Sequence, residues 1–356
     1  MKKLSTVFWV LLLASLACSF GGMPKTFYDT YNANLWLSSM AFSPDCKFLA
    51  VGLSDKTARI LDAHTGKLLE TLRGHDNSVE SVAFSPNGKL FATGSWDTTV
   101  RVWDTTNWKV IQILQHPNLN PGGDNIVKPI AFSPDGKALL TSTGSQGLQF
   151  WDTTTWQVTR TLAPEEAREF MFSADGSRLV IFTSEGEAIT SQDVIEIYDT
   201  ASYNQEFKKI GENVLGVGIS PDGSVLMVAI ANYDDRKGIL VRAVSVPDGN
   251  TISETQMGTS QTASHFAFST NGELAFGDPY GRIQLWDVNS SEVSREVYVF
   301  NNPEYSKKDP PDFYQDQINA LTFCAGGPLF AAGTDQIQFA VWDTTSWQML
   351  WGQIAK

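Results

Sequence analysis

The sequence predicts an all-β fold of seven small antiparallel sheets, and three observations lead to this prediction. A phrase of the type Ala-Phe-Ser-Pro-Asp-Gly recurs along the chain, a second phrase ending in Asp follows most copies, and turn residues separate short apolar runs. Self-similarity of this kind predicts repeats of one supersecondary unit. The aromatic or Ile positions of the first phrase are Phe42, Phe84, Phe132, Phe172, Ile219, Phe268 and Phe323, at intervals of 42, 48, 40, 47, 49 and 55 residues.

The second phrase joins an aromatic or apolar residue to Asp. Its copies are Leu61-Asp62, Trp103-Asp104, Trp151-Asp152, Tyr198-Asp199, Trp286-Asp287 and Trp342-Asp343. The fifth repeat has lost the phrase, and we expect Val241-Arg242-Ala243 in its place. A further aromatic opens the following strand in four repeats, at Trp108, Trp156, Tyr203 and Trp347. Because this place is fixed within the repeat, we interpret these rings as packing residues, with a sugar-stacking or partner-binding surface as the alternative.

Each repeat is expected to form four strands. In the third repeat, Pro134 fixes φ, Asp135 bonds its own backbone and Gly136 accepts a positive φ, which together predict a tight turn. In the second repeat, residues 90–93, 99–103 and 108–114 supply the second, third and outer strands. One four-stranded sheet cannot bury both of its faces, whereas seven sheets stacked around an axis can. The prediction is a seven-bladed β-propeller of four-stranded antiparallel blades over residues 35–356.

The two phrases at this spacing resemble those of the WD-repeat family. The resemblance covers nearly all of residues 35–356 and implies a scaffold that binds a protein or peptide and is not an enzyme. It also implies a supporting hydrogen-bond set in the second repeat, formed by His75, Thr93 or Ser95 (assigned to Ser95), Asp97 and Trp103. The family usually closes its ring by lending an N-terminal strand to the last blade. Here residues 347–354 are expected to give the last blade a fourth strand of its own.

Residues 1–17 resemble a signal peptide for export. Lys2 and Lys3 precede an apolar run at residues 7–13, and small residues precede Cys18. The run is shorter than the about 20 apolar residues of a membrane-spanning helix. The segment resembles the lipobox of bacterial lipoproteins, which implies a lipid on Cys18, a tether at residues 18–34 and an extracytoplasmic, membrane-anchored protein. Secretion without a lipid and an uncleaved anchor are the alternatives.

Composition excludes several function classes. The 356 residues carry a formal charge of −13, and no run of Lys or Arg would offset the repulsion from a phosphate backbone, so no nucleic-acid partner is expected. Four histidines are too far apart to form a metal-ligand motif: His64, His75, His116 and His265. Each turn supplies a single carboxylate, which does not favour calcium. We expect no cofactor, no metal and a monomer.

Cys46 and Cys324 lie in the first and last repeats. Cys46 replaces the turn Gly of the first repeat, and Cys324 follows Phe323 of the last. These repeats are neighbours only if the ring closes, and disulfides form in oxidising compartments. A disulfide between them would hold the ring closed; two partly buried free thiols are the alternative.

The expected binding face carries the insertions of the repeats, at residues 116–125, 183–193, 232–237 and 301–317. The last of these brings Tyr305, Phe313 and Tyr314 among prolines, which favours a binding loop over a solvated excursion. Glu80, Lys128, Arg168 and Asn319 are expected at the mouth of the central channel on the same face, as partner contacts or as a solvated rim. The alternative function is an exported hydrolase or lyase with a site at the channel, for which His265 near Arg168 and Glu169 is the sole hint. A passive surface protein is a third possibility.

Overall fold

The computed structural model describes residues 35–116, 126–143, 146–162, 167–185, 192–211, 213–232, 238–257, 265–269, 273–277, 282–287, 292–299, 318–334 and 338–353. The stretch Asn34–Lys356 forms one compact unit. The expected signal peptide, Cys18 and the tether lie outside the described residues.

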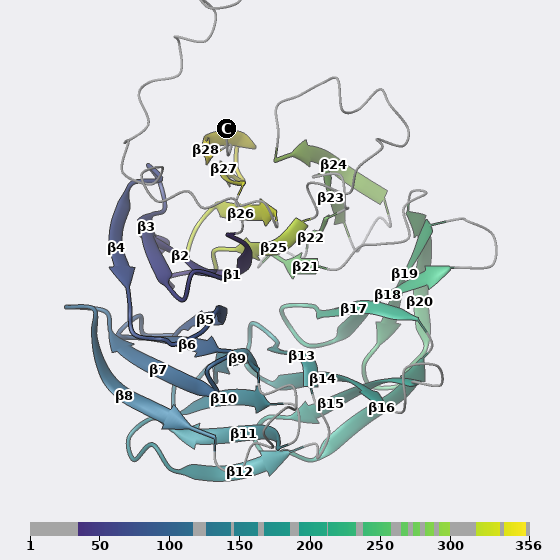
Figure 1. The fold of residues 1–356 in the computed structure, drawn as a ribbon. Helices are drawn as coiled ribbons and strands as arrows, with labels where there is room; N and C mark the ends of the chain where they lie inside the picture. The colour runs from purple at the N-terminus through teal and green to yellow at the C-terminus, as the bar shows by residue number, and fades with distance from the viewer. Residues whose placement is uncertain are drawn as a thin grey trace, which may run out of the picture. The chain divides into compact units, whose positions relative to one another are not determined.

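Every regular element in the described ranges is a β-strand, and the strands form seven antiparallel sheets of four, each in chain order (Figure 1). The first four blades are β1 Leu37–Phe42, β2 Phe48–Leu53, β3 Ala58–Asp62, β4 Leu68–Leu72; β5 Val79–Phe84, β6 Leu90–Ser95, β7 Thr99–Asp104, β8 Lys109–Gln115; β9 Val127–Phe132, β10 Ala138–Thr143, β11 Gly147–Asp152, β12 Val158–Leu162; β13 Ala167–Phe172, β14 Arg178–Glu185, β15 Gln192–Asp199 and β16 Gln205–Gly211. The last three are β17 Val214–Ile219, β18 Val225–Asn232, β19 Gly238–Ser245, β20 Thr251–Met257; β21 His265–Phe268, β22 Glu273–Gly277, β23 Arg282–Asp287, β24 Glu292–Tyr298; β25 Ile318–Phe323, β26 Leu329–Thr334, β27 Phe339–Asp343 and β28 Gln348–Gln353.

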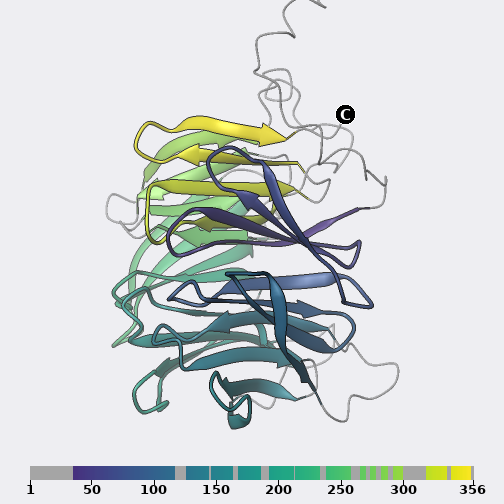
Figure 2. The same cartoon turned by 90° about the vertical axis from the view of Figure 1, so that its left-hand side faces the viewer.

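The blades form a closed ring around a central channel. The first strand of each blade lies innermost and the fourth lies at the rim, and the side view shows the sheets stacked on one another (Figures 1 and 2). Strand β1 contacts β5 on one side and β25 on the other, so the last blade meets the first. The prediction of a seven-bladed β-propeller is confirmed.

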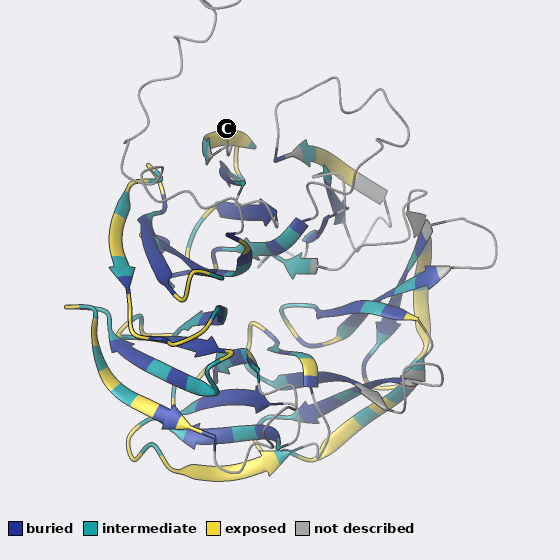
Figure 3. Cartoon of the chain, in the orientation of Figure 1, coloured by how far each residue is buried: buried dark blue, intermediate teal, exposed yellow. Residues whose placement is uncertain are grey.

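The core lies between the blades. Middle strands such as β2 and β26 are almost wholly buried, whereas rim strands such as β8 alternate between exposed and partly or fully buried residues (Figure 3). One cluster shows the principle: Ala50 and Ile60 of the first blade pack with Val82 and Phe91 of the second. Burial of both sheet faces between neighbours contributes most of the favourable free energy, at about 25 cal/mol per Å² of apolar surface.

The turn between the first two strands has the chemistry that the repeated phrase predicts. In the first blade, the Ser43 hydroxyl donates to Asp45 Oδ1 at 2.7 Å and accepts the Phe48 N–H at 2.9 Å. The residue after the turn Asp or Asn takes a left-handed conformation, with φ of 68° at Gly88 and 57° at Cys46. Cys46 therefore accepts a backbone conformation that favours glycine.

The aromatics that open the rim strands are packing residues. Trp108, Trp156, Tyr203 and Trp347 have φ between 54° and 57°, and each N–H donates to the carbonyl of the Asp four residues earlier at 2.6–2.8 Å. The ring of Trp108 contacts Phe48 of the preceding blade edge-on, with centroids 5.6 Å apart. Packing between blades therefore explains why an aromatic residue recurs at the start of the rim strand.

The residue that opens a rim strand packs against a side chain of the preceding blade, and the type of that side chain depends on which residue opens the strand. At two of the four aromatics an Arg stacks on the ring: Arg160 lies 4.6 Å from the Tyr203 ring, and Arg295 lies 5.6 Å from the Trp347 ring. Where a Gly holds this place, the preceding rim strand supplies the aromatic: Phe207 against Gly249 and Trp351 against Gly66. A Cβ on Gly66 would lie 2.6 Å from the Trp351 ring, so the two positions are complementary.

The seam between the last and first blades uses no lent strand within the described residues, because β28 pairs with β27 of its own blade. Cys46 and Cys324 form a disulfide across the seam, with Cα atoms 5.8 Å apart, inside the usual range for such a bond. The Trp351 indole donates to the Ala63 carbonyl at 2.8 Å. Three kinds of contact thus join the same two blades: a covalent bond, a hydrogen bond and ring packing.

The expectation for the fifth repeat was wrong by three residues. Val244 lies opposite Leu226 as Trp103 lies opposite Phe91, so Val244-Ser245 holds the place of the second phrase. Strands β18 and β19 have eight residues each, longer than their counterparts in the second blade, and this extra length moves the turn along the chain.

Candidate partner-binding face

Connections of two kinds reach opposite faces of the ring. The hairpins β1–β2 and β3–β4, with their counterparts, lie at one face; the β2–β3 connections and the links between blades lie at the other. The longest intervals between strands are of the second kind: Tyr298 to Ile318, Gln115 to Val127 and Met257 to His265, followed by Leu72 to Val79 and Glu185 to Gln192. We call the face at which they attach the loop face. The interval from Asn232 to Gly238 is no longer than the hairpins of the opposite face. Residues 300–317 are not described, so Tyr305, Phe313 and Tyr314 stay predictions.

Glu80 and Lys128 lie on adjacent inner strands, β5 and β9. The Lys128 ammonium lies 3.7 Å from Glu80 Oε2, with the Lys128 side chain half-exposed and that of Glu80 13% exposed. The pair joins the second blade to the third. The Glu80 carboxylate is thus mainly engaged within the ring, and the Lys128 ammonium is the accessible charge.

Arg168 and Asn319 have separate partners. Arg168 Nη1 on β13 lies 3.7 Å from the buried carboxylate of Asp193, whose other oxygen accepts the Val214 N–H at 2.7 Å and so fixes the start of the fifth blade. Asn319 on β25 donates its amide N–H to the Leu37 carbonyl at 3.3 Å, across the seam. The structure therefore brings Glu80 and Lys128 together, and it does not gather all four expected mouth residues into one site.

The supporting network of the second blade is a chain of hydrogen bonds. His75 Nδ1 lies 2.8 Å from Asp97 Oδ2 and His75 Nε2 lies 2.7 Å from the Thr93 hydroxyl, which accepts the Trp103 indole N–H at 3.1 Å. Thr93 thus supplies the hydroxyl, and the assignment to Ser95 is corrected. Ser95 donates to the Asn77 carbonyl and accepts the Asp97 N–H. Thr93 and Ser95 share one face of β6, and Thr93 is the nearer of the two to Phe91, the residue that pairs with Trp103 on β7.

Burial alone would raise the pKa of Asp97, but hydrogen bonds from His75, Thr99 and the Asp76 N–H outweigh burial and hold this pKa well below its ordinary value. The third blade keeps part of the network, since the Trp151 indole donates to Thr141 at 2.9 Å. His116 packs edge-on against Trp151, and burial lowers its pKa to about 4. Both histidines are therefore accounted for by the packing of their blades.

Two tryptophans on the loop face were missed by the sequence reasoning. Trp36 is 60% exposed and Trp96 is 40% exposed. The Trp36 N–H donates to the Ser54 hydroxyl, and the Trp36 carbonyl accepts the Ser54 N–H. The Ser54 carbonyl accepts the Ser78 hydroxyl, and the Ser78 carbonyl accepts the Trp96 N–H. A continuous run of bonds thus joins the two positions across the first and second blades. The sequence does offer one signal for these residues: both tryptophans lie outside the two repeated phrases, so the repeat does not account for them.

The residues suggested for a channel enzyme lie on β13 and β21. Arg168 pairs with Asp193 as given above, Glu169 follows it on β13, and the side chain of His265 is not described. Within the described ranges no three His, Cys, Asp or Glu side chains group as metal ligands. A search of the same residues finds no helix with the length and apolar character needed to span a membrane.

Comparison with known proteins identifies the repeats of the first two blades. Residues 66–104 match the family "WD domain, G-beta repeat", and residues 25–77 match the "Anaphase-promoting complex subunit 4 WD40 domain". A segment of 50 residues is 40% identical to the General transcriptional corepressor TUP1 of Saccharomyces cerevisiae. This segment is 14% of the chain and spans 7% of the length of that relative. The protein is a seven-bladed β-propeller that carries WD-repeat sequence in its first two blades.

Proposed function

We propose that this propeller is an extracytoplasmic, lipid-anchored scaffold that acts as a monomer and binds a protein or peptide on its loop face. The observation that carries the proposal is the pair of exposed indoles, Trp36 and Trp96, on that face. Aromatic side chains that remain exposed on a folded surface are typical anchors of protein interfaces. The half-exposed Lys128 ammonium adds polar selectivity at the same face. WD-repeat propellers typically serve as protein-interaction scaffolds.

The test is capture of cross-linked partners by the full exported chain. The double variant Trp36→Ala, Trp96→Ala should recover a specific partner at least about tenfold less well, since loss of two anchor residues costs more than about 1.4 kcal/mol. The control is Ile252→Ala, which removes a side chain that is 59% exposed on the rim strand β20. Equal recovery by the double variant and the unaltered chain would contradict the proposal. A second variant lacking residues 305–314 tests the predicted loop separately.

The anchor has its own test. Cys18→Ser should move the protein from the membrane fraction to the soluble fraction, because the lipid would have no thiol to join. Mass analysis of the N-terminal peptide identifies the modification directly. A protein that stays in the membrane fraction with an unmodified Cys18 would contradict lipid anchoring and would favour an uncleaved anchor.

A further inference from the structure

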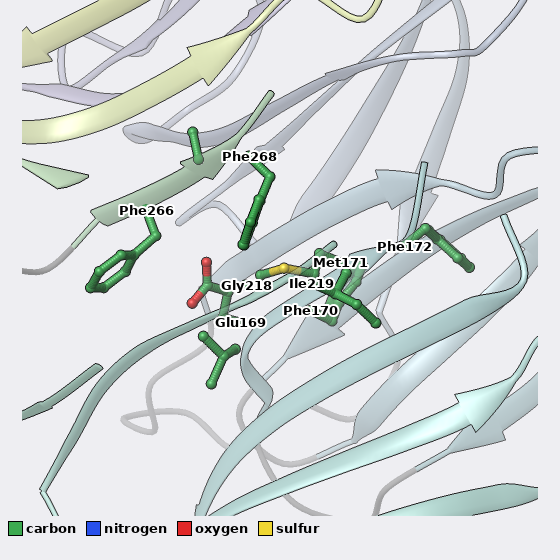
Figure 4. Close-up of a pocket in the computed structure, with 10 residues that line it drawn as sticks. Glu169, Phe170, Met171, Phe172, Gly218, Ile219, Phe266 and Phe268 are labelled. Carbon is green, nitrogen blue, oxygen red and sulfur yellow. The ribbon is translucent and has the colours of Figure 1, made fainter. Parts of the chain in front are cut away.

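A second feature lies on the channel wall, where the inner strands of the fourth, fifth and sixth blades enclose a cavity of about 290 Å³. Its lining includes Glu169 and Met171 of β13, Gly218 of β17, and Phe266 and Phe268 of β21. The Glu169 carboxylate points toward the space between the two phenyl rings (Figure 4). The side chains that line the cavity are therefore apolar apart from one acidic group, and strand backbone supplies polar surface beside it.

Two glycines of β17, the middle strand of this wall, leave room for the phenyl rings of β21. A Cβ on Gly216 would lie 2.6 Å from the Phe266 ring, and one on Gly218 would lie 2.5 Å from the Phe268 ring. Both phenyl rings therefore rest directly on the backbone of β17. Larger residues at either position would displace a ring and change the wall of the cavity.

Glu169 occupies a position that needs no charge for the fold. The equivalent residues of the first two blades are Ser39 and Ser81, whose hydroxyls accept a backbone N–H of the next blade, from Val82 at 3.3 Å and Ile130 at 3.1 Å. Glu169 accepts the corresponding N–H, from Val217. A serine suffices for this bridge between blades, so the longer, ionisable side chain requires another explanation.

We propose that this cavity binds an organic cation, an ammonium or guanidinium group on an apolar stem, with Glu169 as its counter-ion and Phe266 and Phe268 as its walls. Among the described residues Glu169 has no ion-pair partner. When it is ionised, its carboxylate therefore offers a ligand a negative charge that no described cation neutralises, and phenyl faces attract cations through their quadrupole. The inference holds whatever macromolecule docks on the loop face, since the cavity is formed by different residues.

The test is calorimetric titration of the full exported chain at pH 8 with phenethylammonium and with its neutral analogue 2-phenylethanol. The ammonium should bind about tenfold more tightly than the alcohol, through a charge-assisted contact to Glu169. Glu169→Gln should remove that difference and leave alcohol binding unchanged, because the amide oxygen still accepts the Val217 N–H. Phe268→Leu should weaken binding of the ammonium more than binding of the alcohol. Glu206→Gln removes a carboxylate from rim strand β16 of the same blade and should change neither affinity.

Equal affinities of the two probes for the unaltered chain, no binding of the ammonium at millimolar concentration, or full ammonium binding by Glu169→Gln would each overturn the proposal. A further titration compares n-butylammonium with a lysine residue blocked at both ends. Tighter binding of the blocked lysine supports the site and assigns the cation to a polypeptide; equal binding supports the site and assigns it to a free amine.

Discussion

Glu169 combines an ionisable group with a setting that disfavours its charge. Burial against the apolar wall raises its pKa to about 7, and this effect outweighs the Val217 N–H, which lowers it. Because the folded pKa exceeds the ordinary value of 4.5, the folded state holds the proton more tightly than the unfolded chain does. The contribution of Glu169 to stability is therefore fully present below pH 4.5 and is lost as the pH rises toward 7.

Comparison with Glu169→Gln isolates this effect. The free energy of unfolding of the unaltered chain, relative to the variant, should fall by about 2 kcal/mol between pH 4.5 and 7.5. His116 acts in the opposite sense, since its lowered pKa removes stability as the pH falls, but it is common to both proteins and cancels. Urea unfolding over this range provides the measurement. Parallel pH profiles for the two proteins would show that Glu169 does not titrate in this window.

Thr93 is the link between His75 and Trp103. Thr93→Val should lower the free energy of unfolding by about 1–3 kcal/mol, because it leaves buried polar groups of both neighbours without a partner. Thr93→Ser keeps the hydroxyl and should recover most of the loss. Thermal and urea unfolding of the three proteins test this; equal losses for the two variants would assign the effect to the methyl group and its packing.

Single residues could be predicted from the sequence where the repeat fixes them. The family resemblance implies His75, Asp97 and Trp103, whereas Thr93 and Ser95 could not be distinguished, because both lie on the same face of β6 and the choice depends on the register of β6 against β7. Trp36 and Trp96 escaped prediction because exposure is a property of the assembled surface. The Glu169 cavity depends on contacts among three blades, and no spacing within one repeat encodes them.

At the scale of the element, rim strands contact the next blade through one side-chain position, which is held by Arg160, Phe207, Arg295 and Trp351 in four of the blades. An Arg there faces an aromatic of the next blade, and an aromatic there faces a Gly. The sequence displayed the recurring aromatics but not their partners, which are separated by a whole blade or, for Gly66 and Trp351, by nearly the whole chain. Strand number and turn chemistry were predictable because both are local; the exact turn of the fifth repeat was missed because its strands are longer.

Trp351→Ala tests this pairing at the seam. The variant should lose about 2–3 kcal/mol of unfolding free energy, below the range for a fully buried Trp because this ring is only partly covered. It loses both the contact with Gly66 and the hydrogen bond to Ala63. Trp96→Ala removes an exposed indole and should stay within about 0.5 kcal/mol of the unaltered chain. Similar losses for the two variants would contradict a specific role for the Trp351–Gly66 pair.

At the scale of the whole molecule, ring closure decides stability, since an open ring exposes the faces of two blades. The disulfide links residues 278 positions apart, so it restricts a very large loop in the unfolded chain. The double variant Cys46→Ser, Cys324→Ser should therefore lower the free energy of unfolding by about 3–5 kcal/mol. Urea unfolding without reductant measures this. An unchanged unfolding midpoint would show that the remaining seam contacts close the ring unaided.

The most direct test of the closed ring is the state of these two cysteines in the full-length protein, purified without reductant. The chain would be unfolded without reductant, treated with a thiol-reactive label, digested and weighed. We expect Cys46 and Cys324 to be unlabelled and their peptides to be recovered as one linked pair. Recovery of both peptides with label would contradict the covalent seam.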